Sequence, residues 1–172
     1  ARLRGAFGRS PVGNAQAGPG LPSRQQRATP TTPAQIAAIR QSFAGLEASA
    51  PDAARLFYDR LFEISPRTRA LFKTDMEAQG AKLMATLKAV VDHLDRLGEV
   101  LPEARDMAIR HVGYGVTADD YVPVGAALIH MLGSELGPAF TPALQAAWLE
   151  AYATLTGAMI EAAYPEPEVR RA

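Results

Sequence analysis

The stretch that decides the fold is Arg-His-Val-Gly-Tyr-Gly-Val (residues 110–116), which runs on to Asp-Asp-Tyr (residues 119–121). His111 is expected to lie at the end of a helix that opens at Pro102, and two glycines then turn the chain. A further helix is expected to start near Thr117. A histidine at a helix end beside such a corner can aim a ring nitrogen into a slot between helices, as an axial ligand of a metal cofactor requires. One histidine is weak evidence, so this interpretation requires that the rest of the chain forms the opposite wall of a cofactor pocket.

Apolar residues recur at helical spacing on both sides of this stretch. Thr32 and Pro33 are typical of a helix start, and Ile36, Ile39 and Phe43 follow at three- and four-residue steps. No segment shows the alternation typical of a strand. The sequence therefore predicts an all-α fold of six or seven helices joined by short, proline-marked corners. The expected helices begin at 33 and 51 and then span about 78–96, 102–111, 117–136 and 142–164, with a short turn at 66–72.

The chain of 172 residues is long enough for one domain with a substantial core. We expect this domain at residues 32–164. Residues 1–31 read as a disordered tail rich in Arg, Pro and Gly, and residues 165–172 as a C-terminal tail. The arginine-rich start, with no acidic residue before Glu47, is similar to an organelle transit peptide, but it lacks a clear amphipathic helix. An ordinary extension is the favoured interpretation.

Composition excludes several classes of function. Eighteen basic and eighteen acidic residues give a formal net charge of zero, so nothing directs the chain toward nucleic acid or a membrane surface. The absence of cysteine excludes a disulfide framework and thiolate-bound metal sites. No apolar run approaches the roughly twenty residues of a membrane span. A cytoplasmic protein, monomeric or weakly dimeric, is expected.

Five short motifs, in order, resemble bacterial haemoglobins and the globin domains of flavohaemoglobins. The resemblance covers about residues 33–164. His111 follows Gln79 by 32 residues and precedes Tyr121 by ten, and both intervals match that family. The motifs are Leu-Phe-Tyr-Asp-Arg-Leu-Phe (residues 56–62), Ser65-Pro66 with Leu71-Phe72, Gln79 with Leu83, Arg110-His111 with Tyr121, and Ala147-Trp148 with Tyr152.

The resemblance implies a globin fold around haem b and assigns each candidate a role. His111 would ligate the iron, and Tyr121 would help to orient it. Tyr58 and Gln79 would reach the sixth coordination site, where a phenol O–H and an amide N–H stabilise a partly negative ligand. Tyr58, Gln79 and Tyr121 are thus the candidate catalytic residues. The remaining cofactor contacts are Phe72 on the haem plane, Lys82 at a propionate, and the apolar residues Leu83, Met107, Val116 and Val124.

Some features depart from this pattern or allow another interpretation. The family places a glutamate of the last helix beside the proximal histidine, but neither Glu161 nor Glu166 falls in register here, and Pro165 interrupts that helix. Tyr58 could be an ordinary core tyrosine, and Gln79 a solvated residue near a helix start. The other two histidines, His93 and His130, read as structural or surface residues.

Two classes of function remain. The first is reversible dioxygen binding at a five-coordinate ferrous iron, used for nitric oxide dioxygenation or oxygen delivery with an external reductase. The sequence contains no phosphate-binding glycine loop that would belong to a reductase domain of its own. The alternative is a haem-based gas sensor that regulates a partner or an output domain. The alanine-, arginine- and glycine-rich composition suits a bacterial source.

Overall fold

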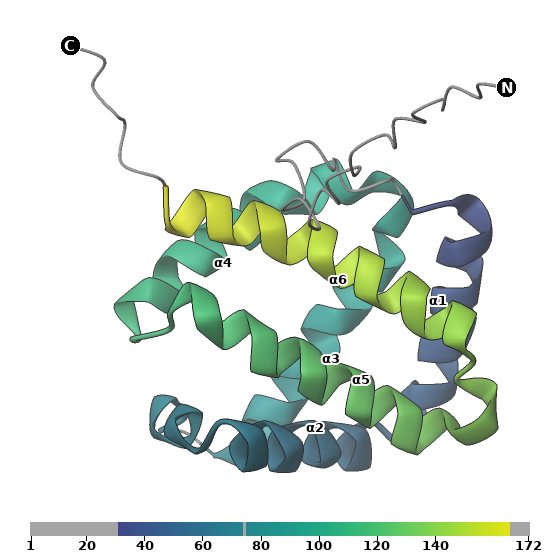
Figure 1. Cartoon of the computed structure of the whole chain (residues 1–172), viewed down its shortest axis with the longest axis horizontal. Helices are drawn as coiled ribbons and strands as arrows, with labels where there is room; N and C mark the ends of the chain where they lie inside the picture. The colour runs from purple at the N-terminus through teal and green to yellow at the C-terminus, as the bar shows by residue number, and fades with distance from the viewer. Residues whose placement is uncertain (1–30, 74, 166–172) are drawn as a thin grey trace, which may run out of the picture.

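The computed structural model describes residues 31–73 and 75–165, and Figure 1 shows them as an arrangement of helices. The prediction of an all-α fold is confirmed. Short 3-10 helices occupy several corners, of which η1 (Pro66–Leu71), η2 (Leu94–Arg96) and η3 (Ala118–Asp120) matter below. The α-helices of the described residues are α1 (Pro33–Glu47), α2 (Ala50–Ile64), α3 (Met76–Asp92), α4 (Leu97–Gly113), α5 (Tyr121–Leu136) and α6 (Pro142–Ala163).

Side-chain caps fix where three of these helices begin. Thr32 forms a capping box with Gln35 at α1, and the Thr141 hydroxyl accepts a hydrogen bond from the backbone N–H of Leu144 at α6. Asp75 accepts hydrogen bonds from the backbone N–H groups at the start of α3. Helix α3 therefore starts at Met76, two residues before the expected Ala78, because Asp75, in the polar segment before residue 78, is the N-cap residue of the helix.

The helix boundary predicted between residues 96 and 102 is wrong. Helix α3 ends at Asp92, and α4 begins at Leu97, so Gly98 does not end a helix and Pro102 does not open one. Pro102 lies inside α4, where its missing N–H costs one backbone hydrogen bond to the Gly98 carbonyl. The preference of proline for a first turn is statistical, and packing of α4 on α6 outweighs that single loss.

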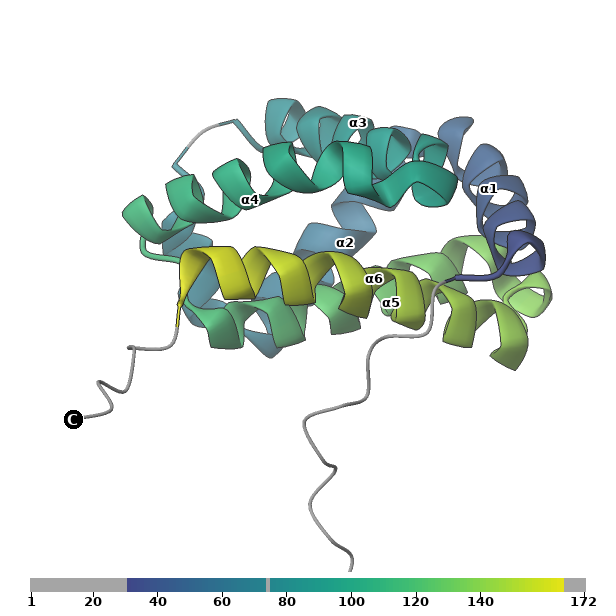
Figure 2. The same ribbon diagram turned by 90° about the horizontal axis from the view of Figure 1, so that it is seen from above.

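The helices form two layers with α3 and α4 on one side and α5 and α6 on the other, as Figure 2 shows from above. Helix α2 packs on α5 and α3, and α4 packs on α6. Helices α3 and α4 diverge from the turn at residues 93–96 like the arms of a V (Figure 1). Contacts between these two arms are sparse compared with those that join α2 to α5 and α4 to α6.

The core lies where α1, α2, α5 and α6 meet. Its largest fully buried apolar side chains are Ile39, Leu46, Leu61, Met131 and Leu132. The buried Trp148 indole N–H donates to the Ser42 hydroxyl at 3.0 Å, which satisfies a polar group inside the core. Met84 and Val91 of α3 and Leu94 of η2 also belong to this core cluster, whereas no described residue of α4 does.

The predicted tails at 1–31 and 165–172 lie outside the described residues, except for Thr31 and Pro165. Among the residues that the structure describes, none of the helices has the length and apolar character needed to cross a bilayer.

Candidate functional site

His111 lies in the last turn of α4 and is half-buried. Its Nδ1 is 2.7 Å from the backbone carbonyl oxygen of Met107. A carbonyl can only accept, so Nδ1 carries the proton and donates, which leaves the lone pair of the neutral imidazole on Nε2. A ring that donates through one nitrogen and presents the other is the arrangement of a metal-ligating histidine.

The corner between α4 and α5 (residues 114–120, the α4–α5 corner) is built directly on this histidine. The backbone N–H groups of Tyr114 and Val116 both donate to the His111 carbonyl oxygen, at 3.0 and 3.1 Å. Gly115 has a φ of +92°, a conformation in which any side chain would be strained. The turn therefore requires a glycine at this position, and the histidine backbone and the corner move together.

Tyr121 opens α5, and its hydroxyl is buried without a hydrogen-bond partner among the described residues. Burial raises the pKa of Tyr121, and the nearby Tyr164 raises it further. The hydroxyl makes no hydrogen bond to His111, so an orienting role for Tyr121 stays a prediction. A buried polar atom without a partner is rare, and it fits a site completed by a bound group.

Tyr58 is 6% exposed and lies in an aromatic cluster at the end of α2. Its ring centroid is 5.2 Å from that of Phe72 and 5.9 Å from that of Phe62. Burial raises the pKa of Tyr58, and a hydrogen bond with the Gln79 side chain acts in the opposite direction. The phenol of Tyr58 and the carboxamide of Gln79 therefore lie within hydrogen-bonding distance of each other, as one polar pair in the aromatic cluster.

The four apolar residues expected to line the pocket are all half-buried rather than buried. They come from α3, α4, the α4–α5 corner and α5, and the two on helices α3 and α4 lie on the two arms of the V. Lys82 is exposed on α3, as an outward-pointing lysine should be. Half-buried apolar side chains on separate elements are typical of the wall of a pocket that binds a flat apolar group. The four residues are Leu83, Met107, Val116 and Val124.

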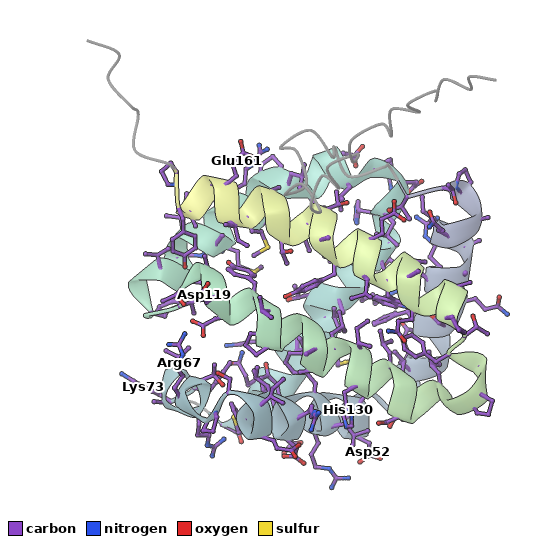
Figure 3. All side chains as sticks on the ribbon, viewed as in Figure 1. Asp52, Arg67, Lys73, Asp119, His130 and Glu161 are labelled. Carbon is purple, nitrogen blue, oxygen red and sulfur yellow. The ribbon has the colours of Figure 1, made fainter. Side chains whose placement is uncertain are left out.

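The two glutamates considered for the proximal side are Glu161 and Glu166. Glu161 is exposed on α6 and lies at the upper rim of the molecule in Figure 3. Glu166 lies outside the described residues. Of the other histidines, His93 donates from Nδ1 to the Ala89 carbonyl oxygen at 2.8 Å, which matches its structural interpretation, and His130 is exposed.

Two contacts at the site were not found from the sequence. The Tyr164 hydroxyl, at the end of α6, donates to the Val116 carbonyl oxygen at 2.5 Å. Arg67 of η1 forms an ion pair with the buried Asp120 of η3. Both contacts join residues about fifty positions apart, and no local spacing signals such a pair.

A cavity of about 720 Å³ lies between α2 and the first half of α3. Tyr58 and Phe62 form part of its wall, together with Met76, Gly80 and Met84. None of His111, Met107 and Leu83 lines this cavity. It therefore meets the predicted site at Tyr58 and does not include the candidate iron ligand.

These residues fit haem. The imidazole with a free Nε2, the buried phenol paired with an amide, the unsatisfied Tyr121 hydroxyl and the half-exposed apolar walls match what a porphyrin and its iron require. His111 would hold the iron, and the apolar residues of both arms would contact the ring.

Comparison with known proteins agrees with this assignment. A family model described as Globin matches residues 55–159. Neuroglobin of Danio rerio is 30% identical over 135 residues, which cover 70% of this chain and 85% of that protein. Flavohemoproteins of Bordetella parapertussis and Rhodopirellula baltica are 34% identical over 109 residues and 31% identical over 116 residues, covering 62% and 66% of this chain. The matches span 27% and 28% of those two proteins. The chain therefore belongs to the globin family, and it is a haem protein that binds small gas molecules.

Proposed function

We propose that this globin is a bacterial, cytoplasmic protein that binds dioxygen reversibly at a five-coordinate ferrous haem. The bound dioxygen is then either used to convert nitric oxide to nitrate or delivered to another protein. The observation that carries the proposal is the buried Tyr58 phenol, hydrogen-bonded with Gln79. When bound, haem supplies the redox chemistry, because its iron donates electron density to dioxygen and can be re-reduced by an electron donor.

The chain's own residues favour a ligand that carries partial negative charge. The Tyr58 phenol keeps its proton at neutral pH, since burial raises its pKa, and it can therefore donate a hydrogen bond. Gln79 is hydrogen-bonded with the phenol, and the two groups act as one polar site in apolar surroundings. A hydrogen bond to a charged ligand in such a site contributes about 1.5–3 kcal/mol. Carbon monoxide, which carries little charge, gains less than dioxygen.

The likeness to flavohemoproteins supports the nitric oxide part of the proposal, over the region that those proteins share with this chain. On the proposed proximal side, the Met107 carbonyl oxygen accepts a hydrogen bond from Nδ1 of His111 and so fixes its tautomer, which keeps Nε2 available as a ligand. Turnover requires one electron per cycle from a reductase that lies outside this globin region. Without that donor, the same site would bind and release dioxygen only.

Absorption spectra of the protein mixed with haemin test the first part of this function. We expect distinct ferric, ferrous and dioxygen-bound spectra and a 1:1 ratio of haem to protein. The second part is tested by adding a flavin-dependent reductase, NADH and nitric oxide, and we expect nitric oxide to disappear as nitrate forms in equal amount. A protein that stays colourless would refute haem binding. A stable dioxygen-bound spectrum with no nitrate would refute turnover and favour dioxygen storage or sensing.

A further inference from the structure

The open end of the V is bridged by an ion pair between two corners. Arg67 lies in the corner between α2 and α3 (residues 65–73, the α2–α3 corner), and its guanidinium is 2.5 Å from Asp120 Oδ1 in the α4–α5 corner. The same nitrogen donates to the Thr117 hydroxyl at 3.1 Å. Figure 3 shows Arg67 extending from the α2–α3 corner toward the corner that carries Asp119. We call Arg67, Thr117 and Asp120 the clasp.

The carboxylate of the clasp is buried and uses both of its oxygens. Asp120 is 4% exposed, although Arg67 is largely exposed. Asp120 Oδ2 accepts from the Thr117 backbone N–H at 2.8 Å and from the Thr117 hydroxyl at 3.0 Å, and Oδ1 accepts from Arg67. A buried carboxylate needs such partners, so its geometry is strictly held. The α4–α5 corner is therefore folded around Asp120, and Arg67 anchors this corner to the α2–α3 corner.

The same two corners also approach each other closely at Gly115. A Cβ placed on Gly115 would lie 3.6 Å from the Leu71 Cδ2 atom, at the end of η1. Because Leu71 directly precedes Phe72, which touches Tyr58, the α2–α3 corner connects to the Tyr58 side of the site. On the opposite side, the amides of the α4–α5 corner donate to the His111 carbonyl. The α2–α3 corner, which carries Phe72, is thus joined by Arg67 to the corner whose amides bond to His111.

We propose that Arg67 is a positioning residue that couples the α2–α3 corner to the iron-ligating histidine, by holding the α4–α5 corner on which the His111 backbone is built. The proposal rests on the proposed function only for the ligand role of His111. Tyr164 holds the same corner through the Val116 carbonyl from the side of α6, so the corner is fixed from two directions. With Arg67 removed, the anchor to α6 remains and the polar anchor to the α2–α3 corner is lost, which leaves only the approach of Leu71 to Gly115 on that side.

Amide hydrogen exchange of the haem-free protein tests the clasp without haem. In Arg67→Ala, we expect the amides of Tyr114 and Val116 to exchange about tenfold faster, with unchanged exchange in α1 and α6. Arg67→Lys keeps the charge and should restore most of the protection. Arg55→Ala, which removes an exposed ion pair to Asp52, is the matched control and should leave both amides unchanged. Equal exchange in Arg67→Ala and the control, or faster exchange in all helices alike, would overturn the proposal.

Resonance Raman spectra of the ferrous haem-bound protein then test whether the coupling reaches the ligand. We expect Arg67→Ala to shift or broaden the iron–imidazole stretching band and to speed haem loss several-fold, with Arg67→Lys in between and Arg55→Ala unchanged. An unaltered band in Arg67→Ala would show that the corner loosens without moving His111 and would overturn the coupling. If the unmodified protein takes up no haem, the proposed function fails, while the exchange experiment still decides whether the clasp holds the corner.

Discussion

Tyr58 and His111 are both polar residues in apolar surroundings, and each is oriented by one neighbour. The carbonyl of Met107 fixes the tautomer of His111, while the Gln79 side chain is hydrogen-bonded with the phenol of Tyr58. Nε2 of His111 is thereby left available as a ligand, and we propose that the Tyr58 phenol donates to the bound gas. Mutating either residue should therefore change ligand chemistry more than it changes folding.

Replacing Tyr58 with Phe removes the phenol donor and keeps the ring that packs on Phe72. We expect dioxygen to leave ten to a hundred times faster, because one hydrogen bond to a charged ligand contributes about 1.5–3 kcal/mol. Stopped-flow displacement of dioxygen by carbon monoxide measures this rate. Tyr114→Phe, at a side chain that is 67% exposed, is the control and should release dioxygen at the normal rate. An unchanged rate in Tyr58→Phe would show that the phenol does not reach the ligand.

Replacing His111 with Ala removes the imidazole that we expect to bind the iron. The variant should lose haem rapidly and lack the five-coordinate ferrous spectrum, and added imidazole should restore part of both properties. Spectra and haem-transfer rates check this result. His130→Ala changes an exposed histidine of α5 and should keep normal spectra. The assignment of His111 would not survive a five-coordinate spectrum like that of the unmodified protein.

At the scale of elements, the crossing of α2 and α3 determines where Gln79 and Tyr58 meet. Gly80 permits this crossing, because a Cβ at that position would lie 2.9 Å from the Ala54 Cβ atom. No real pair of such atoms comes so close, so α3 would have to move away from α2. The glycine next to Gln79 thus sets the distance between the helices that carry the two polar residues.

Gly80→Ala should destabilise the protein despite the better helix propensity of alanine. Overpacking costs about 1–3 kcal/mol, whereas alanine gains about 0.5–1 kcal/mol over glycine in a helix. Gly157→Ala is the matched control, since its Cβ would meet nothing within 4 Å, and it should stabilise by about 0.5–1 kcal/mol. Urea unfolding of both haem-free variants measures whether each substitution lowers or raises the free energy of unfolding. A stabilised Gly80→Ala variant would mean that α2 and α3 separate at little cost.

At the scale of the whole molecule, several tyrosine hydroxyls connect or line the elements around the site. The Tyr152 hydroxyl donates to the Tyr121 backbone carbonyl, and Tyr164 donates to Val116, so that α6 holds both α5 and the α4–α5 corner. Burial is the main cause that raises the pKa of all four tyrosines Tyr58, Tyr121, Tyr152 and Tyr164. The folded protein therefore keeps these protons at a pH where the unfolded chain loses them.

This difference predicts loss of stability at alkaline pH. A group whose pKa is raised by folding contributes stability that is complete below its unfolded pKa of about 10 and is lost as the pH rises toward its folded pKa. We expect the urea midpoint of the haem-free protein to fall steeply above pH 10, after little change between pH 8 and 10. Tyr152→Phe should have a lower midpoint at pH 8 and a shallower fall. A midpoint that stays level to pH 11.5 would contradict the prediction.

Local signals in the sequence were enough for the fold class and for the place of His111. The cap residues Thr32 and Thr141 and the apolar periodicity depend on neighbours within one or two turns, so they predict helices and their faces directly. The same is true of His111, which the glycine corner places at a helix end as expected. The boundary at Pro102 failed for a related reason, because a local preference can be outweighed by packing on α6.

Only the tertiary structure decided how the site is held together. The ion pair of Arg67 with Asp120 spans 53 positions, and the bond from Tyr164 to Val116 spans 48. Neither pair leaves a periodic signal, since each depends on where two corners meet after the helices have packed. The sequence by itself therefore determined which elements form and where the candidate ligand lies. Packing determined which distant residues hold that ligand in place, because such contacts exist only once the chain is folded.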